Sequence, residues 1–177
     1  MRIISGLHKG RKLLAPKKLP VRPTTDMAKE ALFNILNNRY YFDEITVLDL
    51  FSGTGNIAYE FASRGTENIL AVDDNFGCIK FIRQTSESLD MPIEAVRSDV
   101  FRFLENNTKQ FTIIFADPPY DFDQNLFEQI PELVFKNNLL EESGLLIIEH
   151  SKHTDLSNIN NFSFTKSYGG NAFSFFE

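Results

Sequence analysis

The sequence contains no tryptophan, a single cysteine and no run of about 18 consecutive apolar residues. One cysteine cannot form an internal disulfide, so a disulfide-stabilised secreted fold is excluded. The missing apolar run excludes a membrane-spanning helix. The first twelve residues are basic and lack the apolar segment of a secretory signal peptide. These absences predict a cytoplasmic protein that has no membrane partner.

The composition is that of an ordinary globular domain: 177 residues, of which 42% are hydrophobic and 24% charged. This length predicts one domain over residues 1–177, able to bury roughly 70% of its unfolded surface. Charge is distributed unevenly, because residues 1–39 carry nine lysines and arginines against two acids, whereas the remainder has a net charge of −13. A basic segment on an acidic body indicates contact with a polyanion, although charge alone also allows a solvated tail.

Residues 40–177 alternate between short apolar runs and helical stretches, which predicts a doubly wound α/β sheet that is mostly parallel. The expected strands are 45–50, 68–73, 93–97, 111–116 and 145–149, and the expected helices are 57–64, 76–89, 101–106 and 123–137. Residues 162–166 and 172–176 flank a Gly-Gly-Asn turn, and they predict a C-terminal antiparallel hairpin.

The basic segment 1–39 reads as an extension of this core, which we expect to occupy 40–177. Its expected parts are a small hairpin (2–5 with 12–15), a proline-punctuated linker (16–23) and a helix capped by Thr24, Thr25 or Asp26. The helix is predicted because the apolar residues between Ala28 and Leu36 fall on one helical face.

Four aspartates stand at the ends of successive predicted strands. They are Asp49, Asp73, Asp99 and Asp117. In an open α/β sheet, ligands bind outside the carboxyl ends of the strands. One such aspartate often does no more than cap the next helix, but four in register with a glycine loop predict a binding site.

The glycine loop, residues 49–58, lies directly between a predicted strand and a predicted helix. Gly53 and Gly55 allow the backbone to approach a ligand closely, and Asp73 is well placed to accept hydrogen bonds from ribose hydroxyls. The pattern Gly-x-Gly-x-x-Ala also fits a dinucleotide-binding fingerprint. Asp49 favours a different ligand, because its carboxylate would repel a pyrophosphate but suits the cationic amino-acid end of a cofactor.

The most specific pattern is Asp117-Pro-Pro-Tyr120, whose chance occurrence in this length is on the order of one in a thousand. The two prolines leave two peptide nitrogens without hydrogens, so the local polar groups are acceptors: the Asp117 carboxylate and the Pro118 carbonyl. Two acceptors can hold both N–H bonds of an exocyclic amino group while its nitrogen attacks a methyl donor. Tyr120 offers a ring on which the base can stack. A strand-ending turn with a surface tyrosine is the simpler interpretation.

Together these residues resemble class I S-adenosylmethionine-dependent methyltransferases, and in particular the bacterial 16S rRNA guanine-N2 methyltransferases of the RsmD family. The resemblance extends nearly end to end, and its most specific parts are Met1-Arg-Ile-Ile-Ser-Gly6 and Arg22-Pro-Thr-Thr-Asp26. The chain departs from the family pattern at Met27, where arginine is usual, and at Asp73, where glutamate is common. Its glycine loop reads Ser-Gly-Thr-Gly-Asn in place of Ala-Gly-Ser-Gly-Ala.

The resemblance implies a Rossmann-like fold, S-adenosylmethionine as cofactor, and ribosomal RNA or a small-subunit assembly particle as the partner that is methylated at guanine N2. By resemblance, the cofactor would be bound by Asp49, Phe51, Gly53, Gly55, Asp73, Asp99 and Val100, and the target base by Asp117, Pro118 and Tyr120. The basic segment supplies the RNA-binding candidates, which are Lys9, Arg11, Lys12, Arg22, Thr24 and Thr25. Arg22 has a second interpretation, as a contact to the carboxylate of the cofactor.

Three other functions stay open: an amino-methyltransferase acting on adenine or cytosine in DNA, a nicotinamide-dinucleotide oxidoreductase, and a non-catalytic RNA-binding module. The segment 117–120 disfavours the oxidoreductase, the intact aspartate set disfavours the RNA-binding module, and the short chain lacks a separate DNA-recognition domain. The three histidines and Cys78 have no metal-ligand spacing, so we expect no metal. We also expect a monomer, a core position for Cys78, and a packing role for most of the 18 phenylalanines.

Overall fold

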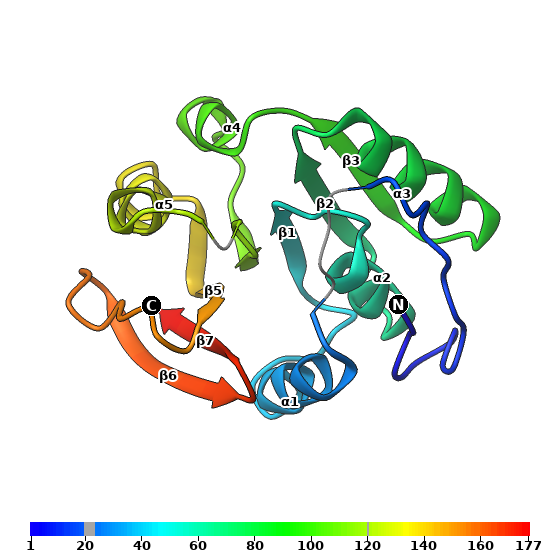
Figure 1. The fold of residues 1–177 in the computed structure, drawn as a ribbon, viewed down its shortest axis with the longest axis horizontal. Helices are drawn as coiled ribbons and strands as arrows, with labels where there is room; N and C mark the ends of the chain where they lie inside the picture. The colour runs from blue at the N-terminus through cyan, green and yellow to red at the C-terminus, as the bar shows by residue number, and fades with distance from the viewer. Residues whose placement is uncertain (20–23, 120) are drawn as a thin grey trace.

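The computed structural model describes residues 1–19, 24–119 and 121–177, and its centre is a twisted sheet (Figure 1). Among the described residues the sheet has seven strands in the order β3-β2-β1-β4-β5-β7-β6. The strands are β1 (Thr46–Leu50), β2 (Asn68–Asp73), β3 (Ile93–Arg97), β4 (Phe111–Ala116), β5 (Leu140–Ser151), β6 (Phe162–Tyr168) and β7 (Asn171–Phe176). Strands β1 to β5 are parallel, and β7 is antiparallel to both of its neighbours.

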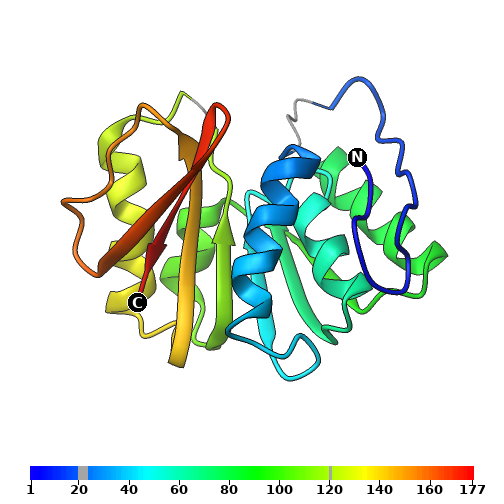
Figure 2. The ribbon, with the colours of Figure 1, turned by 90° about the horizontal axis from the view of Figure 1, so that it is seen from below.

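Five helices cover the two faces of this sheet in the described part of the chain (Figures 1 and 2). They are α1 (Asp26–Asn37), α2 (Asn56–Ser63), α3 (Phe76–Ser88), α4 (Val100–Asn106) and α5 (Gln124–Lys136). One hydrophobic cluster joins α1, α2 and α3 to one face, and a second joins α4 and α5 to the other. The predicted α/β sheet with a C-terminal antiparallel hairpin is therefore confirmed.

The two clusters explain the continuous apolar run of β4. Successive strand residues point to opposite faces, so Ile113 enters one cluster and Ile114 the other. All six residues of β4 are buried, as expected for a central parallel strand covered on both faces.

Strand β5 begins at Leu140, five residues earlier than predicted. Residues 141–143 are polar, and Glu141 is held there by hydrogen bonds from the hydroxyls of Thr46 (3.0 Å) and Thr112 (2.9 Å).

Helix α1 begins as the sequence predicts, because the hydroxyl of Thr25 accepts a hydrogen bond from the Ala28 amide at 3.2 Å. Asn75, Asp99 and Asp123 cap α3, α4 and α5 in the same way. Each of these three caps follows a parallel strand, so the amino ends of these helices gather at the carboxyl edge of the sheet. This is the edge at which ligands bind in open α/β folds.

The N-terminal segment forms a hairpin over residues 1–13, shorter than the predicted pairing of 2–5 with 12–15, and this hairpin packs against the body. Arg2 pairs with Lys12 in an antiparallel bridge, and the Ile3 amide donates to the Arg11 carbonyl at 3.0 Å. Ile3 and Leu13 are buried in the first hydrophobic cluster. A solvated tail is therefore the wrong interpretation of these residues. The predicted linker lies partly outside the described residues, which omit 20–23.

Candidate active site

A cavity of about 620 Å³ opens at the carboxyl ends of the parallel strands. Its volume is within the range of small-molecule and cofactor sites. Most of the predicted site residues that the structure describes line it: Thr24, Asp49, Phe51, Gly53, Asp73, Asp99, Val100, Asp117 and Pro118. The fold thus brings residues from the ends of four strands and from the amino end of α1 to one place.

The glycine loop after β1 is held by Asp73, the last residue of β2. One carboxylate oxygen of Asp73 accepts from the Gly53 amide at 2.8 Å, and the other accepts from the Asn75 amide at 2.9 Å. Phe51 and Gly53 have positive φ angles of 55° and 52°, a conformation that is unusual for the phenylalanine. Asp73 also lines the cavity, and a carboxylate can accept more hydrogen bonds than these two, so Asp73 both shapes the loop and can bind a ligand.

Asp49 is the most buried acid of the cavity, with 1% of its surface exposed. One carboxylate oxygen accepts from the Ala58 amide at 3.2 Å, in the first turn of α2. The pKa of Asp49 is raised to about 8, chiefly by burial; the Ala58 amide opposes this shift, and the nearby charge of Asp73 adds to it. A cationic ligand group in the cavity would supply a counter-charge for this buried carboxylate.

Asp99 and Val100 form the wall beyond β3. The Asp99 carboxylate accepts from the Arg102 amide at 2.9 Å and so caps α4, which is the simple role that a single strand-ending aspartate can have. Its side chain is nevertheless exposed to the cavity, and Val100 lies buried beside it. Capping and ligand binding use different lone pairs of one carboxylate, so the two roles are compatible.

Asp117 and Pro118 follow β4 on the other side of the glycine loop. The Asp117 amide donates to the Leu50 carbonyl at 3.3 Å, which fixes this segment beside the end of β1. Asp117 is half-buried and Pro118 is buried. Both line the cavity together with Pro119. The residues of the predicted acceptor-rich corner therefore line the same cavity as Asp49 and Asp73.

Several predicted residues lie elsewhere. Gly55 does not line the cavity; it precedes α2 with a φ angle of 85°, and an added Cβ would lie 3.0 Å from side-chain atoms of Tyr59 and Ile82. Thr25 caps α1 at the surface. The three hairpin cations, Lys9, Arg11 and Lys12, are exposed and outside the cavity. Arg22 and Tyr120 lie outside the described residues, so their assigned roles stay predictions.

The cavity has an aromatic wall that was not predicted from the sequence. Phe101 and Phe122 stack with ring centroids 6.1 Å apart and an interplanar angle of 19°, and Phe51 meets Phe122 edge-on at 5.4 Å. All three line the cavity. Phe101 and Phe122 stand within five residues of Asp99 and Asp117, and this proximity was the available signal. Helical or loop position alone could not separate them from the many phenylalanines that only pack.

Two polar residues of the glycine loop were also missed. The Ser52 hydroxyl is buried at the cavity wall and has no hydrogen-bond partner in the described part of the chain, so it can receive a ligand group. Asn56 lines the cavity as well, and its side chain bonds to residues of the N-terminal segment. In the family pattern noted above, both positions carry alanine, so the loop of this chain is more polar than usual.

Cys78 lines the cavity from α3 and is 1% exposed. Burial raises the pKa of its thiol to about 11, and Asp73 and Asp74 add to the shift. The thiolate form that a nucleophile needs is therefore disfavoured, as expected for a core cysteine.

Within residues 1–19, 24–119 and 121–177, no group of three or more histidine, cysteine or acidic residues is arranged to hold a metal ion. Those same residues include no helix able to cross a membrane.

Comparisons with known proteins identify the family of this chain. The family model described as Conserved hypothetical protein 95 matches residues 1–177. The chain belongs to this family. One relative, the ribosomal RNA small subunit methyltransferase D of Haemophilus influenzae, is 33% identical over 94% of this chain and 86% of its own length. The predicted kinship with the RsmD family is confirmed.

Solved structures share the fold along the whole chain. A hypothetical protein of Thermus thermophilus has a TM-score of 0.86 and 27% identity, with 100% of this chain and 99% of that chain covered. The 16S rRNA N2 G1207 methyltransferase of the same organism, solved with AdoMet and guanosine, has a TM-score of 0.70 and 19% identity. The second alignment covers 90% of this chain and 45% of that chain, and at this identity it supports the fold alone.

Proposed function

We propose that this chain transfers the methyl group of S-adenosylmethionine to the N2 amino group of a guanine in small-subunit ribosomal RNA. The observation that carries the proposal is the meeting of two chemically different corners in one cavity. Asp49, Asp73 and Asp99 supply carboxylates for a cationic, ribose-bearing cofactor, and Asp117 with Pro118 supplies acceptors for an amino group. The family relatives named as rRNA methyltransferases support the same conclusion.

The cavity suits the proposed cofactor group by group. The buried Asp49 carboxylate fits an ammonium group, and the Asp73 carboxylate fits a pair of hydroxyls. The aromatic wall of Phe101 and Phe122 fits a flat heterocycle. A pyrophosphate would meet Asp49 and Asp73 together, which argues against the nicotinamide-dinucleotide oxidoreductase.

When bound, the cofactor supplies a methyl group that an amine can attack. The residues of this chain would then have two tasks. The Asp117 carboxylate and the Pro118 carbonyl accept hydrogen bonds from the two N–H groups of the amino group. These two hydrogen bonds hold the nitrogen in place and favour the pyramidal geometry that attack requires. The aromatic wall excludes water from the cofactor side. No strong base is needed, because the amine is cationic after the transfer and loses its proton readily.

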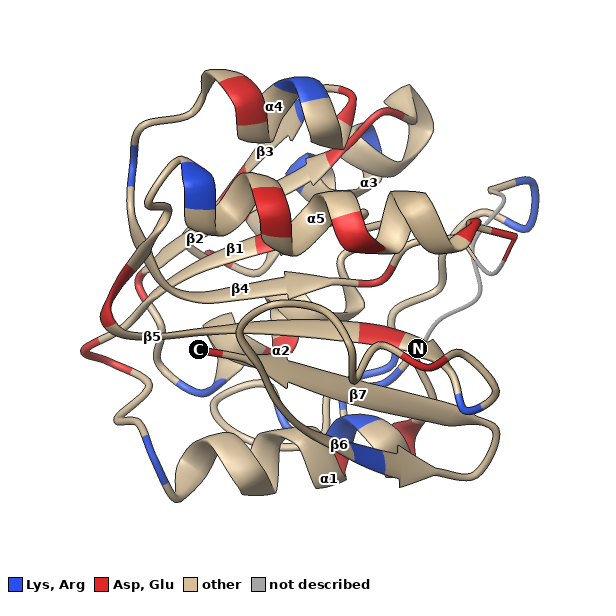
Figure 3. Cartoon of the chain, turned by 90° about the vertical axis from the view of Figure 1, so that its left-hand side faces the viewer, with Lys and Arg blue, Asp and Glu red and all other residues tan. Residues whose placement is uncertain are grey.

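A ribosomal RNA substrate also accounts for the distribution of charge. Seen from the side of α4, α5 and β6, acidic and basic residues are interspersed, as in α5, which carries Glu128, Glu132 and Lys136 (Figure 3). The N-terminal hairpin, in contrast, carries four cations and no acid. We assign this hairpin to phosphate contacts, and we place the enzyme in the cytoplasm as a monomer acting on the RNA or on a small-subunit assembly particle.

The cofactor assignment is tested by binding measurements. We expect saturable binding of S-adenosylmethionine by calorimetry and no saturable binding of NAD. Asp73→Ala should weaken cofactor binding by about 1.5–3 kcal/mol, the scale of a hydrogen bond to a charged group. Asp74→Ala removes the same charge from the neighbouring residue and should cost less. Tight NAD binding by the wild-type protein would contradict the methyltransferase proposal.

The raised pKa of Asp49 predicts a pH dependence of cofactor affinity. Below its pKa of about 8, Asp49 carries a proton that must leave before the carboxylate can pair with the cofactor ammonium. Affinity should therefore rise with pH, by up to about tenfold per unit, and then level off near the pKa. Calorimetry between about pH 6 and pH 8, in buffers of different ionisation enthalpy, would measure both the affinity and the released proton.

Two controls isolate this effect. Methylthioadenosine lacks the amino-acid end of the cofactor, so its affinity should not depend on the protonation of Asp49. Asp49→Asn should bind the full cofactor more weakly and without the pH dependence. A flat affinity profile for the wild-type protein, with no proton released on binding, would show that Asp49 does not pair with the ammonium group.

A further inference from the structure

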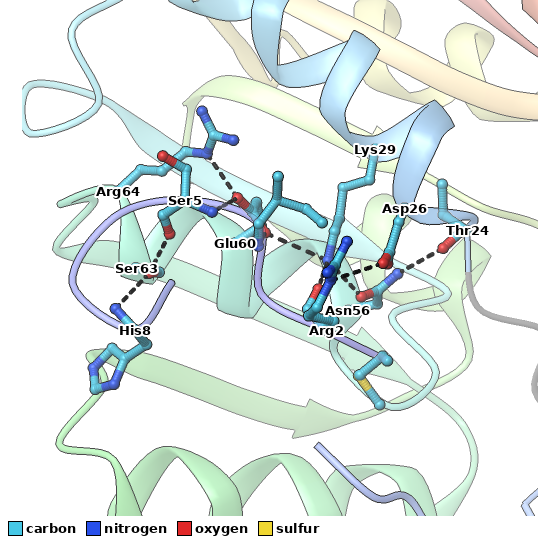
Figure 4. Close-up of polar contacts among 12 residues, drawn as sticks. Arg2, Ser5, His8, Thr24, Asp26, Lys29, Asn56, Glu60, Ser63 and Arg64 are labelled. Carbon is cyan, nitrogen blue, oxygen red and sulfur yellow. Dashed lines mark hydrogen bonds and ion pairs between the residues drawn. The ribbon is translucent and has the colours of Figure 1, made fainter. Parts of the chain in front are cut away.

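The N-terminal hairpin lies along α2, from the cavity wall to the far end of the helix (Figure 4). At its start, the Met1 sulfur lies 3.9 Å from the hydroxyl of Thr54, a residue of the cavity wall. At its tip, the Leu7 amide donates to the Ser63 carbonyl at 2.7 Å. Helix α2 has eight residues, about 12 Å of length. The hairpin is thus an extended element whose cations stand at defined positions relative to the cavity.

Glu60 of α2 holds the hairpin in this place. Its side chain is fully buried, and its two carboxylate oxygens accept from the amides of Ile4 (2.8 Å) and Ser5 (3.0 Å). The same oxygens pair with Lys29 at 3.4 Å and with Arg64 at 2.9 Å. A buried carboxylate is tolerated only when its lone pairs and its charge are satisfied. Detaching the hairpin would leave Glu60 without its two amide donors, so the docked position is strongly preferred.

Lys29 extends the network from the hairpin to the cavity. Its ammonium group, 1% exposed, donates to the Arg2 carbonyl at 2.6 Å and to the Asn56 side-chain oxygen at 2.9 Å. The amide nitrogen of Asn56 donates in turn to the Thr24 carbonyl at 3.1 Å. Asn56 and Thr24 both line the cavity. A continuous chain of hydrogen bonds, buried on both sides of Asn56, therefore connects the hairpin backbone with the wall of the candidate active site.

We infer that Glu60 and Gly6 are positioning residues that hold the N-terminal hairpin as a fixed guide for the RNA strand that enters the cavity. This inference rests on the proposed function, because it needs an RNA substrate. The exposed cations Lys9, Arg11 and Lys12 would contact phosphates along the guide. The contribution of these cations to RNA affinity then depends on where the hairpin is held as well as on their charge.

Gly6 provides a test that changes no charge. Its φ angle is 81°, and an added Cβ would lie 1.7 Å from the Ser63 carbonyl oxygen, so alanine must displace the hairpin from α2. Gly10 is the matched control, because it has the same φ angle of 81° but no atom within 4 Å of an added Cβ. Both substitutions strain the backbone equally. Only Gly6→Ala removes the docking.

The measurements are the affinity for an in vitro transcribed 16S rRNA fragment at several salt concentrations, the affinity for S-adenosylhomocysteine, and limited proteolysis of the hairpin. Gly6→Ala should expose the hairpin to protease, lower RNA affinity at least about tenfold and lower the salt slope by about 2. Its affinity for S-adenosylhomocysteine should stay within about twofold of wild type. Gly10→Ala should resemble wild type in all three. Ser63→Ala, which removes hydrogen bonds to His8 and Ser5, is a second displacing variant if Gly6→Ala does not fold.

Three results would overturn the inference. A displaced hairpin with wild-type RNA affinity and slope would mean that its position is irrelevant. An equal loss in Gly10→Ala would assign the effect to backbone strain, and a parallel loss of S-adenosylhomocysteine binding would make the hairpin a part of the fold only. A different result would contradict the proposed function itself: the wild-type protein would transfer no methyl group to small-subunit RNA.

Discussion

Replacing Asp117 by alanine is expected to lower the rate of methyl transfer to small-subunit RNA at least about 100-fold, with the protein still folded. The carboxylate is half-buried at the end of β4 and lines the cavity, where it can hold one N–H bond of the target amino group. Without it, the amino group loses an acceptor at the moment when its nitrogen must leave the plane of the base. Single-turnover transfer of a labelled methyl group measures the effect on chemistry directly.

A series of substitutions at position 117 separates the effect of losing the hydrogen-bond acceptor from the effect of losing the negative charge. Asp117→Asn keeps one acceptor oxygen and should retain more activity than Asp117→Ala. Affinity for S-adenosylmethionine should be nearly unchanged in both, since the proposed cofactor contacts come from the ends of β1, β2 and β3. Equal transfer rates in wild type, the asparagine variant and the alanine variant would show that Asp117 does not hold the amino group.

Neutralising Lys9, Arg11 and Lys12 together is expected to lower the salt slope of RNA binding by about 2–3, with a corresponding loss of affinity. Each phosphate contact that a cation makes releases counterions and adds roughly 0.7–0.9 to that slope. All three side chains are exposed on the N-terminal hairpin, so their replacement by glutamine removes charge without removing buried contacts. RNA binding measured from low to moderate salt gives the slope.

The same triple variant should bind S-adenosylmethionine with nearly wild-type affinity, because none of the three residues lines the cavity. A matched control neutralises Lys80, Arg102 and Lys136, which are exposed cations of α3, α4 and α5 on the acidic body. We expect little change of slope in that control. An unchanged slope in the hairpin variant would place the RNA on another surface, or would mean that RNA is not the partner.

Most element boundaries were predictable because local patterns determine them. The strands β2, β3 and β4 occupy the residues predicted. The clearest of them is β4, because a strand covered on both faces carries a continuous apolar run. The helices begin near polar caps such as Thr25 and Asn75, whose side chains satisfy the first amides of the helix. The polar start of β5 was missed, because its partners Thr46 and Thr112 lie far away in the sequence.

The candidate site was predictable in part for a related reason. Parallel strands end at one edge, so aspartates that follow successive strands must lie near one another, and Asp49, Asp73 and Asp117 do line one cavity. No comparable rule predicts the aromatic wall. Phe101 and Phe122 come from segments after different strands, and only the packing of α4 and α5 brings their rings together.

The charge of the N-terminal segment was evident in the sequence, but its placement was decided by tertiary structure alone. Lys29 stands in an amphipathic helix where a lysine is usually solvent-exposed, yet it is buried against Glu60, 31 positions along the chain. Burying either charge without the other would cost too much free energy. The residue pattern of each helix, taken alone, does not indicate that the other helix carries its partner. Local composition therefore determined which residues are basic, whereas the pairing of two buried charges across α1 and α2 decided where the basic hairpin lies.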